Sequence, residues 1–161
     1  LTAHADQYVV LFSHHGLPNL TNPVPDPALP TDQRMLAAAV EAAIHRHPNV
    51  IAWVNGHSHV NRVYPRPRPG GGGFWEINTA AHVDHPQHAR IVEVVDNHDG
   101  TLSIFATLVD HAGPAATADQ PTGVLELASL SRELAVNEFQ EPADRVGQPG
   151  DRNVELLLPT P

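Results

Sequence analysis

Two short apolar runs on either side of a helical pattern constrain the fold of this 161-residue chain more than any other feature. The runs cover residues 8–12 and 50–54, and neither alternates with polar residues. Continuous apolar runs of this length are typical of strands that are buried on both faces of a parallel sheet. Between them, Leu36, Val40 and Ile44 recur at helical spacing. The sequence therefore predicts a strand, a crossover helix and a parallel strand.

Capping and breaking residues set the expected bounds of that helix. Thr31 is predicted as the N-cap, with Asp32 in the first turn, where a negative charge is favourable. Five prolines between residues 16 and 30 exclude a helix before this point. The apolar face continues to His47, and Pro48 stops the helix.

The middle of the chain predicts a further strand and a hairpin. Residues 64–73 are rich in Pro, Arg and Gly and are predicted as a loop with little order of its own, whereas residues 74–78 are predicted as a strand. Two more strand-like runs, residues 90–95 and 101–109, flank Asp99-Gly100. This dipeptide is typical of hairpin turns, because Gly tolerates a positive φ.

The last third of the chain predicts one helix and one short packing segment. The helix is expected from about Pro121 to Phe139, with Leu127, Leu130 and Leu134 on one side. Beyond it the composition becomes polar, and residues 154–158 are the part that is able to pack.

Composition excludes several classes of function. The formal net charge of −9 argues against nucleic acid as a partner, since phosphate binding requires a basic surface. The chain has no cysteine, so disulfides and thiolate metal sites are excluded. No apolar run approaches the about 20 residues of a membrane span, and no membrane partner is expected.

Histidines follow both apolar runs and predict a metal site. His14 and His15 come after the first run, and His57 and His59 come after the second, in a Gly-His-Ser-His turn. Ligands of open α/β sheets collect at the carboxyl ends of parallel strands, so we expect His14, His57 and His59 to lie together. Neutral imidazole is a good ligand for Zn, Fe, Mn or Ni. A turn that begins at Gly56 is able to direct His57 and His59 toward two ions about 3.5–4 Å apart.

Placed in this order, the motifs resemble the C-terminal half of the calcineurin-like metallophosphoesterases. The likeness is carried by Ser13-His14-His15-Gly16 after one strand and by residues 55–59 after the next, and it covers roughly residues 8–139. Residues 73–82 and 99–105 are similar to an actinobacterial branch of that family.

This resemblance implies both a fold and a reaction. The fold would be part of a four-layer α/β/β/α sandwich around two metal ions (Mn, Fe or Zn). A metal-bridging hydroxide would attack the phosphorus of a phosphomonoester or phosphodiester, a small-molecule substrate. His14 and His57 would ligate one ion and His59 the other. His15 would be a catalytic neighbour that bonds the substrate or supports the ligands.

Departures from the family pattern imply that the site is incomplete. The family also requires an Asp-x-His motif, a Gly-Asp motif and a Gly-Asn-His-Asp/Glu motif, all N-terminal to the part present here. Residues 96–99 mimic the last of these, but they follow the Gly-His-x-His turn and are rejected for this reason. We expect a fragment that lacks its carboxylate ligands and is inactive without the N-terminal half of the same protein. Members of this branch can carry export signals, which would lie upstream of Leu1.

The resemblance also divides the chain, and the residues after the second histidine turn offer further candidates for contact with the substrate. Residues 1–115 would be the C-terminal portion of the phosphoesterase domain, residues 116–140 a C-terminal helix, and residues 141–161 a Pro-rich, partly ordered tail. His82 would line the substrate cleft, although a polar loop before a strand is an equally good interpretation. Arg62, Arg66 and Arg68 would attract a phosphate-bearing substrate, but a solvated loop is the better interpretation of this segment.

Two other classes of protein compete with this hypothesis. Different metal enzymes fit poorly, because a cupin requires an acid soon after His-x-His, and residues 60–68 contain none. A non-catalytic interaction module whose histidines bind metal opportunistically is the stronger alternative, since the expected carboxylates are missing.

Overall fold

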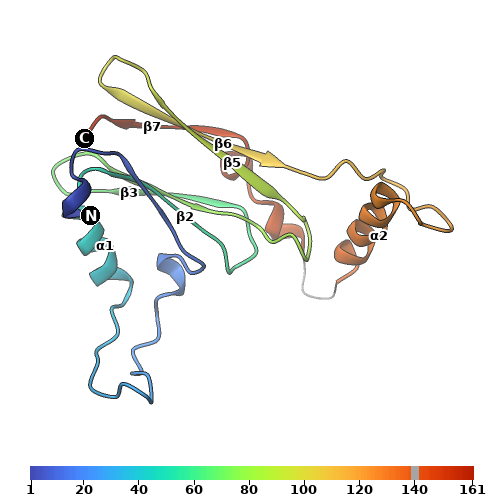
Figure 1. Cartoon of the computed structure of the whole chain (residues 1–161), viewed down its shortest axis with the longest axis horizontal. Coiled ribbons are helices and arrows are strands. Elements are labelled where there is room, and N and C mark those ends of the chain that lie inside the picture. The colour runs from blue at the N-terminus through green and yellow to red at the C-terminus, as the bar shows by residue number, and fades with distance from the viewer. Residues whose placement is uncertain (139–141) are drawn as a thin grey trace.

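The computed structural model describes residues 1–138 and 142–161, and these form a mixed α/β fold with two sheets and two α-helices (Figure 1). The first sheet has the strand order β1-β2-β4-β3, and the second has the order β5-β6-β7. The strands are β1 (Val9–Phe12), β2 (Val50–Asn55), β3 (Arg62–Pro67), β4 (Gly73–Asn78), β5 (Ala89–Asp96), β6 (Thr101–Val109) and β7 (Val154–Pro159). The helices are α1 (Ala37–His45) and α2 (Val124–Val136), with the 3-10 turns η1 (Thr2–His4), η2 (Leu17–Asn19), η3 (Pro142–Val146) and η4 (Pro149–Asp151).

The predicted strand, helix and parallel strand are confirmed. β1 pairs in parallel with β2, with Leu11 opposite Trp53 and Phe12 opposite Val54, and α1 lies between the two strands in the sequence. The predicted strand at residues 74–78 is β4, which pairs in parallel with the other side of β2. Three parallel strands therefore end at the same edge of the sheet.

Apolar contacts arrange these elements in layers. The inner faces of the two sheets meet in one core, to which Ile51 and Ile77 contribute from the first sheet and Leu102 and Ile104 from the second. A second core, around Trp53, lies on the opposite face of the first sheet and includes Leu17 of η2 and Ile44 of α1. β2 is thus buried on both faces, as its continuous apolar run predicts. The same prediction is wrong for β1, which is only partly buried and leaves Phe12 exposed, because it lies at the edge of the sheet.

Helix α1 is shorter than predicted at both ends. It begins at Ala37 instead of after Thr31, because the preceding segment forms turns of its own: the N–H of Asp32 donates to the carbonyl of Leu29 at 3.0 Å. The N–H of Ala37 donates to the carbonyl of Leu20 at 3.0 Å, which ties the first turn to the end of η2. At the other end the backbone leaves the α-helix after His45 in a tight turn before Pro48.

The prediction of a loop at residues 64–73 is wrong for its first part, because Arg62–Pro67 forms the edge strand β3 against β4. Pro lacks an N–H and is tolerated in a sheet where this group would face away from the neighbouring strand. The N–H of Val63 already points away from β4, since it donates to Asp151 Oδ1 at 2.8 Å. Pro65 and Pro67 follow at intervals of two and share this outward orientation.

The predicted hairpin is present, and the predicted C-terminal packing segment forms a strand. β5 and β6 pair antiparallel across a turn in which His98 (φ 59°) and Gly100 (φ 91°) adopt the left-handed conformation. β7 covers the predicted packing segment and pairs with β6. The second predicted helix is α2, and it begins at Val124, where Glu126 accepts the N–H groups of the two residues before it. The predicted end at Phe139 lies outside the described residues.

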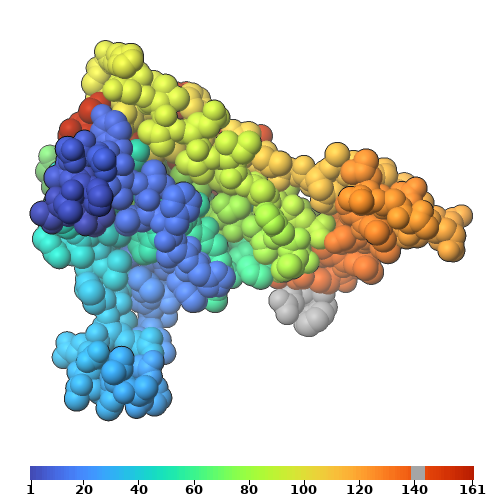
Figure 2. Space-filling model, viewed as in Figure 1, coloured from blue at the N-terminus to red at the C-terminus, as the bar shows by residue number. Residues whose placement is uncertain are grey.

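Two parts of the chain project from the sheets (Figures 1 and 2). The Pro-rich segment between η2 and α1 forms a lobe of its own, with Val24 and Leu29 exposed. Helix α2 lies beyond the open end of the β5–β6 hairpin, where β5 begins and β6 ends, instead of over the face of either sheet (Figure 1). Within residues 1–138 and 142–161, no helix combines the length and apolar character that crossing a membrane requires.

A buried carboxylate lies at the centre of the first sheet. Glu76 of β4 is fully buried, and its Oε2 accepts hydrogen bonds from Arg66 Nε (2.8 Å) and Nη2 (2.5 Å) of β3. Its Oε1 accepts the N–H of Leu17 at 2.8 Å and Asn55 Nδ2 at 2.9 Å. A buried charge requires a partner and several hydrogen bonds, and Glu76 has both.

The network continues from Glu76 to both histidine loops. Asn78 Nδ2 donates to Asn55 Oδ1 at 2.7 Å and to the carbonyl of Gly56 at 2.5 Å. Leu17 follows directly after Gly16, where a methyl group would overlap both the Glu76 carboxylate and the Asn55 amide. The segment after His15 is therefore held tightly against the carboxylate, and glycine is required at this close approach.

Replacement of Glu76 by Ala should lower the free energy of unfolding by about 3–5 kcal/mol, because it leaves the partly buried guanidinium of Arg66, an N–H and a buried amide without their acceptor. Chemical denaturation of the two proteins measures this difference. Glu93→Ala on exposed β5 is the matched control and should change the free energy of unfolding by no more than about 0.5 kcal/mol. Equal effects of the two substitutions would contradict the role given to Glu76.

Candidate metal centre

Three histidines meet at the carboxyl edge of the first sheet, where the sequence predicts a site. His14 and His15 follow β1, and His57 follows β2. One nitrogen from each ring can be chosen so that all three lie within 4.8 Å of one another, and all three side chains are exposed. His57 Nδ1 and His14 Nε2 are 3.0 Å apart, and the rings of His15 and His57 are 4.0 Å apart between centroids.

Hydrogen bonds between the two loops hold the rings together. The N–H of Gly56 donates to the carbonyl of His14 at 3.1 Å, so the second loop is bonded directly to the first. Ser13 Oγ accepts Trp53 Nε1 at 2.8 Å and donates to the carbonyl of His15 at 2.6 Å. The buried indole of β2 thus fixes the backbone that carries His14 and His15.

The Gly-His-Ser-His turn has an unusual backbone. His57 (φ 67°) and His59 (φ 57°) both adopt the left-handed conformation, which is uncommon for residues other than Gly and costs free energy. Ser58 between them donates its hydroxyl to Asn78 Oδ1 at 2.9 Å. The turn is therefore held by the same polar network that contains Glu76, and its two rings point in different directions.

The electrostatics of the cluster favour the neutral form of His57. The pKa of His57 lies below its ordinary value of 6.5, first because neighbouring atoms exclude water from the ring and then because His15, His14 and His59 would repel its positive charge. A lowered pKa keeps the ring nitrogen free of its proton at neutral pH, and a metal ligand must be in this state.

His59 does not join the cluster, although the sequence predicts that it lies with His14 and His57. Its Nδ1 lies 2.7 Å from Asp84 Oδ2, on the loop that follows β4. His59 still lies close enough to His57 to lower the pKa of that ring. His15, predicted as a neighbour of the ligands, instead contributes a nitrogen to the cluster itself.

The two predicted substrate residues lie elsewhere. Arg62 Nη1 donates to Asp151 Oδ2 of η4 at 3.1 Å, so its charge is paired with a largely buried carboxylate. His82 lines a cavity of about 360 Å³ between the end of the β5–β6 hairpin and α2, together with Val109, His111 and Ser131. Neither residue belongs to the three-histidine cluster.

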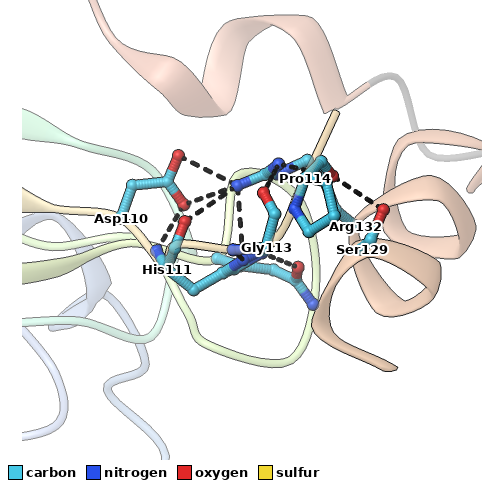
Figure 3. A network of polar contacts seen from close by, with 7 residues as sticks. Asp110, His111, Gly113, Pro114, Ser129 and Arg132 are labelled. Atoms are coloured by element: carbon cyan, nitrogen blue, oxygen red, sulfur yellow. Dashed lines mark hydrogen bonds and ion pairs between the residues drawn. The ribbon is translucent and has the colours of Figure 1, made fainter. Parts of the chain in front are cut away.

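A polar network beside this cavity attaches α2 to the end of β6 (Figure 3). Arg132 of α2 donates to the carbonyls of Gly113 (2.9 Å) and His111 (3.0 Å) and faces the Asp110 carboxylate at 3.4 Å. Ser129, one helical turn before, donates to the carbonyl of Pro114 at 2.7 Å. This contact explains why α2 lies at the end of the hairpin.

Sequence reasoning missed the residues that support the histidines. Asn55 and Asn78 end adjacent parallel strands and lie directly opposite each other, so a comparison of the two strand ends would have identified the pair. Asp84 gives no signal in the sequence, because its contact with His59 joins positions 25 residues apart across an irregular segment.

The donor set fits one transition-metal ion. Three neutral imidazoles are the ligands that Zn, Fe, Mn and Ni accept in catalytic sites, and exposure of the cluster leaves room for further ligands. In the described part of the chain, this is the group of His, Asp and Glu side chains close enough to hold an ion, and it includes no carboxylate.

No protein-family model matches the sequence, and no curated protein matches it.

Proposed function

We propose that this chain carries the histidine half of a metal-dependent phosphoesterase, which hydrolyses a phosphomonoester or phosphodiester in the complete protein. One observation carries the proposal: three imidazoles from the ends of two adjacent parallel strands offer ring nitrogens that all lie within 4.8 Å of one another. Parallel sheets collect their functional groups at this edge. The order of the motifs, a His-His pair followed by Gly-His-x-His, adds the resemblance to the calcineurin-like family.

In this proposal His14, His15 and His57 hold one ion, with His15 as a ligand in place of the neighbouring role expected from the resemblance. His59 is a ligand of the second ion. Carboxylates from the N-terminal half of the same protein complete the ligands of both ions. The fold of the whole would be the four-layer α/β/β/α sandwich. The position of β1 at an edge of the first sheet supports it, because further strands can pair there.

When bound, the ions supply positive charge that stabilises the charge developing on the phosphoryl oxygens. The residues of this chain contribute the geometry. Asn55, Asn78 and Ser13 hold the loops, and the lowered pKa of His57 keeps its ring available as a ligand at neutral pH. His82 and Arg62 remain candidates for contact with substrate only if the missing half brings the substrate to them.

A non-catalytic metal-binding module is the second candidate. It is favoured by the composition of the cluster, which among the described residues contains no carboxylate. An exposed group of three histidines is able to bind a metal ion in a protein that catalyses no reaction.

His57→Ala removes one of three ligands and should lower the affinity of the chain for Zn²⁺ by more than about 100-fold. Loss of an outer-shell partner of a ligand, for comparison, costs about 10–100-fold. Titration calorimetry on the 161-residue chain measures the affinity. His98→Ala, in the exposed hairpin turn, is the matched control and should leave the affinity unchanged. Metal binding that survives His57→Ala would contradict the proposed centre.

Zn²⁺ affinity should decrease as the pH falls below about 7, since protons compete with the ion for ring nitrogens. The pKa of His57 is lowered, so this ring stays neutral at pH values just below 6.5, where an ordinary histidine takes up a proton. His57 is therefore lost as a metal ligand at a lower pH than an ordinary histidine would be. Calorimetry between pH 5 and 8 tests this, and an affinity that is constant over the range would exclude imidazole ligands.

The longest natural form of the protein, loaded with Mn²⁺ or Zn²⁺, should hydrolyse bis(p-nitrophenyl) phosphate or p-nitrophenyl phosphate. Release of p-nitrophenol measures turnover, and His57→Ala should abolish it while His98→Ala does not. If this form binds metal through His57 but hydrolyses neither ester, the non-catalytic module is the correct function.

A further inference from the structure

One ring nitrogen of His59 is already committed within the chain. Its Nδ1 lies 2.7 Å from Asp84 Oδ2, and the same oxygen accepts Arg145 Nη1 at 2.7 Å. Asp84 is less exposed than the histidine, with 18% of its side chain accessible against 38%. The carboxylate is thus held from the side of η3 by a guanidinium, and it presents one oxygen to the imidazole.

This contact defines the tautomer of the neutral ring. A carboxylate only accepts hydrogen bonds, so the hydrogen must reside on Nδ1 of His59. The lone pair of the neutral imidazole then lies on Nε2. Among the described residues, none forms a hydrogen bond with this Nε2, so it is available to a ligand from outside the chain.

The surrounding backbone holds His59 in place. Its left-handed conformation (φ 57°) is followed by fully buried Asn61, whose N–H donates to the carbonyl of Arg145 at 2.9 Å. Asn61 Oδ1 accepts the N–H of Ala80 at 3.1 Å, four residues before Asp84. The histidine, the carboxylate and the guanidinium therefore come from three segments that are bonded to one another.

We propose that Asp84, oriented by Arg145, is a positioning residue that fixes His59 in the Nδ1–H tautomer and presents Nε2 to a metal ion. The inference rests on the proposed function, which assigns His59 to the second ion. Carboxylates that accept the remote N–H of a metal-bound imidazole orient the ring and increase its basicity. A carboxylate with a purely structural role would pair with Arg145 and leave the tautomer of His59 unchanged.

Nitrogen NMR of the 161-residue chain without metal, at pH 8, tests the first half of this proposal. His59→Gln assigns the ring signals. The wild-type ring should show the hydrogen on Nδ1, whereas Asp84→Ala should shift it toward the Nε2–H form that exposed histidines favour in water. Asp110→Ala is the matched control, because Asp110 also pairs with an arginine but does not contact His59. A wild-type ring protonated on Nε2, or a tautomer unaffected by Asp84→Ala, would overturn the proposal.

Metal stoichiometry of the longest natural form tests the second half. Asp84→Ala should weaken one of two Zn²⁺ sites by about 10–100-fold and leave the other unchanged, and Asp84→Glu should restore part of the loss. Two unaltered sites in Asp84→Ala would overturn the proposal. If the wild-type protein binds no metal, the proposed function fails, and the NMR result still decides whether Asp84 sets the tautomer of His59.

Discussion

The Glu76 carboxylate is the interaction on which the rest of the structure depends. It is fully buried in the middle of the first sheet, and it accepts bonds from β3, from the end of β2 and from the start of η2. The bonds from Leu17 and Asn55 join the two segments that carry the histidine cluster to the same carboxylate. Because an unpaired buried charge is very costly, these segments can adopt only arrangements in which all bonds are made together.

The site follows from this constraint combined with the geometry of parallel strands. β1 and β2 end side by side, so the residues after them share an edge of the sheet. The Asn55–Asn78 pair and Ser13 then convert neighbouring loops into a defined cluster of imidazoles. Two left-handed histidines in one turn cost free energy, and the network that holds Ser58 and Gly56 stabilises them.

Prediction from the sequence succeeded where the signal was local. The apolar runs and the helical spacing of Leu36, Val40 and Ile44 identified the parallel pair, and the position of His14 and His57 after those runs identified the edge. It failed at β3, where Pro65 and Pro67 concealed an edge strand. The contact of His59 with Asp84 could not be predicted either, because it joins residues 25 positions apart across an irregular loop.

The sequence by itself determined which residue types end the strands and therefore where histidines gather, since strand periodicity and chain order are local properties. Only the tertiary structure decided that His15 joins His14 and His57, and that His59 turns toward Asp84 and Arg145. Those choices depend on the backbone conformation of two loops and on hydrogen bonds between residues far apart in the chain. Such bonds form only when the whole set of buried polar groups is satisfied at once.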